Sequence, residues 1–185
     1  MNYEVFTAKE LARRLTHPTP IDHGLASGVF VQVALPQEGA QFMRDLAVEL
    51  ECDGVRVFKE HACDMLPPDA LALLTSKFKA LDLERNKRLD SVMGETLADV
   101  VARTLHPHGI VVALLIEGVQ ALLGRPGERI LKALKAARDA GNLHPSHSGR
   151  FLLVAACTLP ADIELFVLDR GNAFYGATAM TICNK

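Results

Sequence analysis

The segment that follows the first β-branched run is the first place where this sequence could do chemistry. It opens a helical pattern, and a helix N-terminus attracts anions through its free N–H groups and its dipole. Phosphate binding at such a turn also needs several glycines, a lysine that reaches the outer phosphates and a hydroxyl that holds magnesium. Ala40 and Gln41 occupy the lysine and hydroxyl positions here, Gly39 is the one glycine, and Glu38 adds negative charge. The turn, which starts at Pro36, is therefore poorly suited to hold a phosphate.

A second candidate is Glu117, which follows the apolar run at residues 110–116. A carboxylate at a strand end can hold a magnesium ion, so Glu117 is the single residue that we consider as a metal ligand. A hydrolytic site needs a further acid to activate water, and Gly118 has no side chain that could accept a proton. Thr158, which follows the run at 151–156, supplies a hydroxyl that could orient a ligand.

Histidines and cysteines suggest a different chemistry. A cluster after the predicted strand at 54–58 contains His61, Cys63 and Asp64. These residue types support an alternative hypothesis, in which the protein is an unrelated enzyme with its active site at the ends of the strands. Further histidines lie in two proline-containing loops: His106, His108, His144 and His147. Their spacing lacks the defined ligand set of a zinc site, so we expect no resident metal.

Apolar runs alternate with helical patterns along the chain. We expect strands at 28–34, 54–58, 110–116, 151–156 and 178–183, and helices at 8–15, 42–50, 68–105, 127–140 and 161–169. Strands that are apolar on both faces need helices on both sides, joined by right-handed crossovers. The sequence therefore predicts an α/β fold, a three-layer αβα sandwich with a mainly parallel five-stranded sheet. Its ligands would bind beyond the carboxyl ends of the strands.

The composition indicates one domain without an extreme charge. The chain has 185 residues, of which 49% are hydrophobic, and 20 basic residues against 22 acidic ones. This balance gives no field that would attract nucleic acid or an anionic membrane, and no apolar run approaches the roughly 18 to 20 residues of a membrane helix. We expect a lead-in helix and loop over 1–27 and the αβα core over 28–185. Because the sequence starts without a signal peptide and its cysteines form no CxxC pair, we expect a cytoplasmic protein.

Several stretches of the sequence match a known family. They are residues 13–20 with 27–30, residues 114–120 at the position of a Walker B strand, residues 133–139 in the following helix and residues 173–176, which read Ala-Phe-Tyr-Gly. On these stretches the chain resembles the nucleotide-binding core of the AAA-type P-loop ATPases. Within them it is similar to a bacterial group of uncharacterised ATP-binding proteins. The resemblance implies a P-loop NTPase-like fold.

The departures from the family pattern fall on the catalytic positions. Gly39-Ala40-Gln41 stands in place of Gly-Lys-Ser/Thr, Glu117-Gly118 stands in place of Asp-Glu, and no residues follow Lys185 to build the helical lid of the family. Loss of the lysine removes a charge-assisted contact of about 1.5 to 3 kcal/mol, and loss of a catalytic base costs about 10² to 10⁴ in rate. The resemblance thus implies a catalytically inactive pseudo-ATPase module without a resident cofactor.

Two functions remain open for such a module. It could act through a protein partner or through self-association as a homo-oligomer. Alternatively, it could be a degenerate nucleotide-binding protein that binds ATP or ADP with magnesium, without turnover. The candidate nucleotide-binding residues are Pro36, Glu38, Gly39, Ala40, Gln41, Glu117 and Thr158.

Two features of the matched stretches have mainly structural interpretations. Arg138 and Asp139 are expected to form an ion pair near a helix end, although an arginine there could also face a neighbouring subunit, as arginines in AAA assemblies can. Phe174-Tyr175-Gly176 is expected to pack the last turn against the sheet.

Overall fold

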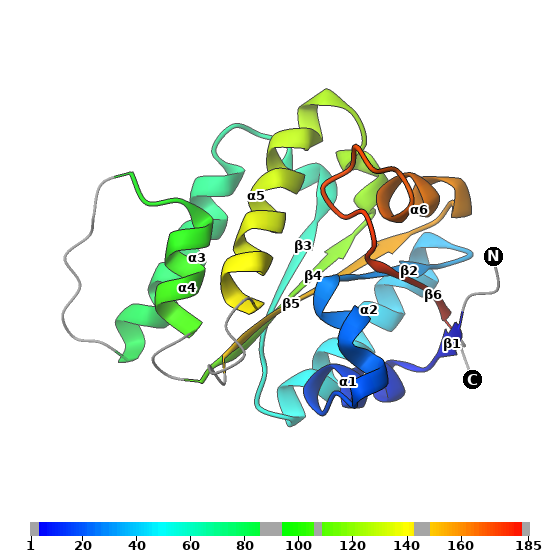
Figure 1. Cartoon of the computed structure of the whole chain (residues 1–185), viewed down its shortest axis with the longest axis horizontal. Helices are drawn as coiled ribbons and strands as arrows, with labels where there is room; N and C mark the ends of the chain where they lie inside the picture. The colour runs from blue at the N-terminus through cyan, green and yellow to red at the C-terminus, as the bar shows by residue number, and fades with distance from the viewer. Residues whose placement is uncertain (1–3, 86–93, 106–108, 143–148, 183–185) are drawn as a thin grey trace.

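All strands of the sheet run parallel. The structure, a computed structural model, describes residues 4–85, 94–105, 109–142 and 149–182. The sheet has six strands in the order β1-β6-β2-β5-β4-β3 (Figure 1). The strands are β1 (Glu4–Phe6), β2 (Val29–Gln32), β3 (Arg56–His61), β4 (Val111–Glu117), β5 (Arg150–Cys157) and β6 (Thr178–Ile182).

Helices connect the strands and cover both faces of the sheet. The α-helices are α1 (Ala8–Thr16), α2 (Pro36–Cys52), α3 (Ala70–Arg85), α4 (Leu97–Leu105), α5 (Arg125–Asn142) and α6 (Pro160–Val167). Short 3₁₀ helices are η1 (Pro20–Ser27), η2 (Ala62–Met65) and η3 (Val119–Leu122). This arrangement confirms the predicted αβα sandwich with a parallel sheet.

Each face of the sheet has its own hydrophobic core, because alternate residues of a strand point to opposite sides. In β2, Val29 and Val31 pack in a core with α1 and α2, whereas Phe30 packs in a second core with α3, α4, α5 and α6. Strand β5 behaves in the same way, with Leu152 on the first face and Leu153 on the second. The apolar residues of the strands and helices therefore fill two cores that share one sheet.

The prediction of five strands was wrong by one strand. Residues 1–27 were expected to hold only a helix and a loop, but Glu4–Phe6 forms β1 and pairs in parallel with β6 at the edge of the sheet. A strand of three residues is too short to show an alternating pattern in the sequence. The helical stretch predicted at 68–105 consists of α3 and α4, and residues 86–93 between them lie outside the described residues.

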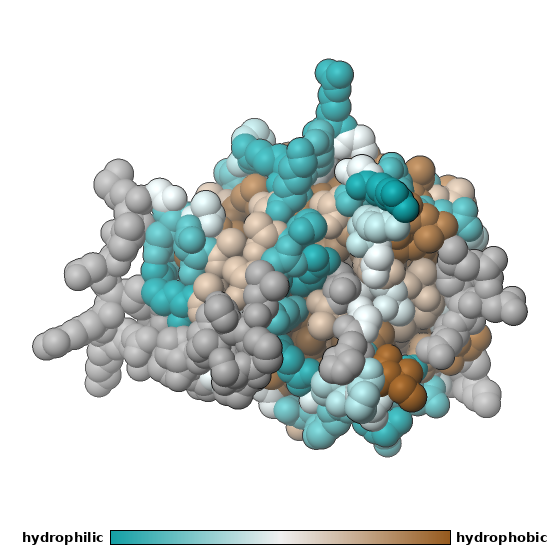
Figure 2. Space-filling model, viewed as in Figure 1, coloured by the Kyte–Doolittle hydropathy of each residue, from teal (hydrophilic) through white to brown (hydrophobic). Residues whose placement is uncertain are grey.

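The surface mixes polar and apolar residues. Figure 2 shows hydrophilic areas interspersed with smaller hydrophobic ones over the view of Figure 1. Among the described helices, none has the length and apolar character that crossing a membrane requires.

A buried ion pair fastens η1 to α1. The Asp22 side chain is almost fully buried, pairs with the Arg14 guanidinium, and accepts hydrogen bonds from the Thr19 hydroxyl at 2.6 Å and the Thr19 amide at 2.9 Å. The Thr19 hydrogen bonds, and then the Arg14 charge, lower the pKa of Asp22 to about 2. The negative charge of Asp22 therefore stabilises the folded state.

We expect this interaction to make the stability depend on pH. Because the folded-state pKa of Asp22 lies below its ordinary value of 3.8, its contribution is complete above about pH 4 and is lost as the pH falls toward about 2. Denaturant unfolding of the wild type and of Asp22→Asn should show a free-energy difference that shrinks across this window. The exposed Asp69 supplies the control Asp69→Asn, which should not change this dependence. A constant difference between Asp22→Asn and the wild type from pH 5 to pH 2 would contradict the interpretation.

Candidate functional site

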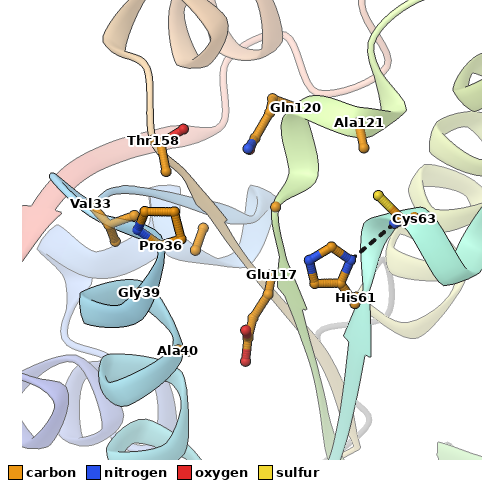
Figure 3. Close-up of a pocket in the computed structure, with 12 residues that line it drawn as sticks. Val33, Pro36, Gly39, Ala40, His61, Cys63, Glu117, Gln120, Ala121 and Thr158 are labelled. Carbon is orange, nitrogen blue, oxygen red and sulfur yellow. Dashed lines mark hydrogen bonds between the residues drawn. The ribbon is translucent and has the colours of Figure 1, made fainter.

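A cavity of about 220 Å³ lies at the carboxyl edge of the sheet (Figure 3). It is lined from α2, from the ends of β3 and β4 and from the segments that follow β2, β3, β4 and β5. The lining residues are Val33, Pro36, Gly39, Ala40, His61, Cys63, Glu117, Gly118, Gln120, Ala121, Ala156 and Thr158. Five of the seven predicted site residues therefore line one cavity: Pro36, Gly39, Ala40, Glu117 and Thr158.

The topology explains why a cavity forms here. Strand β2 pairs with β5, and the Val33 amide extends this contact by donating to the Cys157 carbonyl at 3.0 Å. The helix that follows β2 covers one face of the sheet, whereas the helix that follows β5 covers the other face. The two chain segments diverge where the strands end, which leaves a crevice at this switch in strand order.

The N-terminus of α2 is closed by its own residues. Glu38, in the first turn of α2, accepts a hydrogen bond from the Leu35 amide at 3.2 Å through its carboxylate. The amides of Glu38 and Gly39 donate to the Leu35 carbonyl, and Pro36 has no N–H to offer. Only residues 33–35 separate β2 from α2. A carboxylate of the chain thus accepts a hydrogen bond at the helix end where a phosphate would be expected.

The two predicted residues outside the cavity lining have other partners. Glu38 caps its own helix, as described above. Gln41 lies on the exposed side of α2, where its amide donates to Asp45 at 2.7 Å and accepts from Arg44 at 2.8 Å. Gln41, a predicted site residue, therefore does not line the cavity.

Gly39 is needed for the close approach of α2 to the end of β2. A Cβ atom at Gly39 would lie 3.1 Å from Cγ2 of Val33. Gly39 therefore has a packing role in this chain, and that role does not require a phosphate.

Glu117 extends into the cavity between α2 and the ring of His61 (Figure 3). The two residues lie side by side because His61 and Glu117 are register partners of β3 and β4. The carboxylate is half-buried and has no hydrogen-bond or ion-pair partner within the described part of the chain. Glu117 is the uncompensated charge of this site.

Gly118 adopts the left-handed conformation with φ of 66°, and a Cβ at this position would lie 3.2 Å from Nε2 of His61. His61 is held there because its Nδ1 accepts a hydrogen bond from the Cys63 amide at 3.3 Å. The position next to Glu117 therefore has no room for a second acid without displacement of His61.

The alternative enzyme hypothesis needed His61, Cys63 and Asp64 to converge. His61 and Cys63 line the cavity, but Asp64 lines a separate hollow beside Leu73 and Lys77. Among the described contacts, the Cys63 backbone amide donates to the His61 ring, but no hydrogen bond joins two of the three side chains. They do not form a Cys-His-Asp site.

Gln120 is a polar residue of the cavity that the sequence did not indicate. Its Oε1 atom is buried and has no hydrogen-bond partner in the described part of the structure. Gln120 lies in η3, two residues after the strand-end glycine, where a single glutamine carries no recognisable signal. Beside it, burial raises the pKa of the Cys157 thiol, which keeps this sulfur protonated.

No group of three or more metal-ligating side chains occurs among the residues that the structure describes. His106, His108, His144 and His147 lie outside those residues. Glu117 stands alone as a carboxylate ligand in the cavity, whereas magnesium is usually held by one or two carboxylates together with substrate phosphates.

The two most distinctive stretches of the resemblance contact each other. The guanidinium of Arg138 lies 5.2 Å from the centre of the Phe174 ring and pairs with Asp139 at 2.6 Å. Phe174 in turn packs on Phe30, which stacks on Phe166. This confirms the predicted ion pair and the packing of the last turn against the sheet.

Comparisons with known proteins agree on the fold alone. No protein-family model and no curated protein sequence matches the chain. Among solved structures, the chain is similar to the FIGL-1 AAA domain in complex with ADP, with a TM-score of 0.54 and 15% sequence identity. The similarity covers 96% of this chain and 53% of that one, so the chain spans about half the length of its structural neighbour. The chain therefore has an α/β fold that resembles an AAA P-loop domain.

We expect Gly118→Ala to destabilise the fold by about 1 to 3 kcal/mol, because it combines a left-handed backbone with a contact to His61. Gly54 is a matched control, since its φ is also positive, at 80°, but no atom lies within 4 Å of its Cβ position. Denaturant unfolding should show a larger loss for Gly118→Ala than for Gly54→Ala. Adding His61→Ala should restore the extra stability that Gly118→Ala loses relative to Gly54→Ala. Adding His61→Ala to Gly54→Ala should restore nothing. Equal losses at the two glycines would show that His61 does not exclude a side chain.

Proposed function

We propose that this protein is a catalytically inactive, AAA ATPase-like module that acts by binding a protein partner or another copy of itself. The observation that carries the proposal is the closed N-terminus of α2. Glu38 already accepts the Leu35 amide, and Ala40 supplies no cation. A phosphate at this turn would meet a carboxylate where it needs N–H donors and a lysine.

The end of β4 supports the same proposal. Hydrolysis needs a base that accepts a proton from water, and Gly118, with no side chain, occupies the position beside Glu117. Because His61 packs against Gly118, an acidic side chain at position 118 would displace the His61 ring. Arg138 has a structural role on Phe174 and Asp139, so its contacts supply no argument for a catalytic arginine.

Binding of a macromolecule would explain why the chain has an ATPase-like fold but lacks the side chains that ATP hydrolysis needs. The residues that position the crevice remain, and exposed apolar side chains occur beside it. Leu35 is 48% exposed and Leu159 is 57% exposed, and each is a direct neighbour of a lining residue, Pro36 and Thr158 respectively. An exposed leucine side chain gains free energy when a partner covers it, which favours a protein contact at these positions.

The second candidate is a protein that binds nucleotide without turnover. The observation in its favour is that Glu117 and Thr158 line one cavity with the start of α2, where a magnesium ion and a phosphate would need them. Such binding would depend on Glu117 as the metal ligand.

We expect isothermal titration calorimetry with magnesium and ATP, ADP or GTP to show no micromolar binding, because the helix end is capped and the lysine is absent. Phosphate release should likewise not exceed that of buffer. Micromolar affinity would contradict the leading proposal, and its loss in Glu117→Ala would favour the nucleotide-binding alternative. Light scattering after size-exclusion chromatography reports whether the partner is a second copy.

A further inference from the structure

We infer that a second copy of this chain joins the sheet at the edge formed by β3, so that two β3 strands pair in antiparallel across a two-fold axis. The inference deepens the proposed function and rests on it, since it names the partner as another copy and the surface as the β3 edge. It starts from the strand order, in which β3 lies at one edge and pairs with β4 alone among the described strands. An edge strand presents a row of N–H and C=O groups that can pair with a further strand.

The backbone of β3 has hydrogen-bonding groups to offer. Its pairing with β4 continues without interruption over six residues, from Arg56 to His61. Among the described contacts, the β3 backbone has no other hydrogen-bond partner. The strand contains no proline, so none of its residues lacks an N–H donor. The outer edge of β3 can therefore form a regular ladder with another strand.

Open space lies beside this edge. A hollow of about 590 Å³ is lined by residues 54–58, by Glu51 of α2 and by Leu81 of α3. Helices α2 and α3 cover opposite faces of the sheet, so the hollow lies along the first half of β3 between the two helical layers. An incoming strand would lie in this hollow, next to the β3 backbone.

The side chains of β3 favour a copy of the same strand. Arg56, Phe58 and Glu60 share one face of the sheet, because alternate residues of a strand point to the same side. This is the face covered by α3, where Phe58 packs on Phe78 with ring centres 5.0 Å apart and Glu60 pairs with Lys77. The order along this face is cation, aromatic ring, anion. Such an order is complementary to itself when the strand direction is reversed.

An antiparallel pair centred on Phe58 uses this complementarity. A two-fold axis perpendicular to the sheet places Phe58 opposite its own copy, and it places each Arg56 opposite the Glu60 of the other copy. Directly opposite residues have Cβ atoms about 4.5 to 5.5 Å apart, so aromatic pairs and opposite charges stabilise the pairing. A centre at Lys59 or Glu60 would bring like charges together, and a centre at Val57 would form no opposite-charge pair within β3.

Both charged groups are available for these pairs. Arg56 is exposed, and its side chain has no ion pair or hydrogen bond within the described part of the chain. Glu60 accepts Lys77 through Oε1, and its Oε2 has no partner among the described contacts. The Arg56 guanidinium of a second copy would supply that partner.

Sedimentation equilibrium of the full chain, at concentrations up to about 100 µM, tests the inference. The wild type should fit a monomer–dimer equilibrium, and Arg56→Glu should weaken dimerisation by about tenfold or more, because it makes two attractive pairs repulsive. The matched control Lys59→Glu reverses a charge on the same strand, opposite Val57 of the second copy, and should leave dimerisation unchanged. A monomeric wild type, or equal effects of the two variants, would overturn the inference.

A charge exchange tests the antiparallel register. Glu60→Lys should also weaken dimerisation, since Arg56 would then lie opposite a lysine. Mixed with Arg56→Glu, it should form a heterodimer at least about tenfold more stable than either homodimer, because both pairs then join opposite charges. If the mixture forms no heterodimer although circular dichroism shows both variants folded, the register is wrong. The comparison of Arg56→Glu with Lys59→Glu changes no ion pair described within the chain, so it decides the inference independently of Glu60→Lys.

Failure of this inference is distinguishable from failure of the proposed function. Micromolar nucleotide binding contradicts the proposed function whatever the oligomeric state. A monomer that binds no nucleotide leaves the pseudo-ATPase proposal standing, with a different protein as its partner, and removes only the β3 interface.

Discussion

Strand β2 pairs with β5 over four residues, from Val29 with Val154 to Gln32 with Cys157, and the Val33 amide continues the contact. The rest of the structure depends on this pairing. Each of the two strands must be buried on both faces, so one connection leaves toward α2 and the other toward α6. The crevice and the residues that line it follow from this divergence.

The pairing preserves a crevice, but the groups at its mouth have the wrong charge for a phosphate. A helix N-terminus offers partial positive charge, and here Glu38 uses the Leu35 amide before any ligand can. Glu117 lies deeper in the cavity, and none of the described lining residues is a lysine or an arginine. The same fold that positions anions in other proteins thus creates an acidic pocket in this one. The similarity to the FIGL-1 AAA domain, at 15% identity, extends to the fold and not to these side chains.

The sheet was predictable from the sequence because its central strands are apolar on both faces, as in Val111–Glu117 and Arg150–Cys157. The strand at Glu4–Phe6 was not, since three residues carry no periodic signal and its pairing with β6 joins opposite ends of the chain. The crevice at the strand ends was also predictable, and Pro36 and Thr158 line one cavity there. The capping role of Glu38, the contact of His61 with Gly118 and the buried Gln120 oxygen were not, because each depends on the angle at which a loop leaves its strand.

The central claim is that the first turn of α2 is closed to phosphate by Glu38. The most direct measurement is the amide chemical shifts of Leu35, Glu38 and Gly39 in the full chain during titration with magnesium and ATP. The account predicts that these three amides keep their chemical shifts to millimolar nucleotide, because each already donates a hydrogen bond within the chain. A saturable shift of all three at micromolar nucleotide would mean that a phosphate displaces the Glu38 carboxylate, and it would contradict the account.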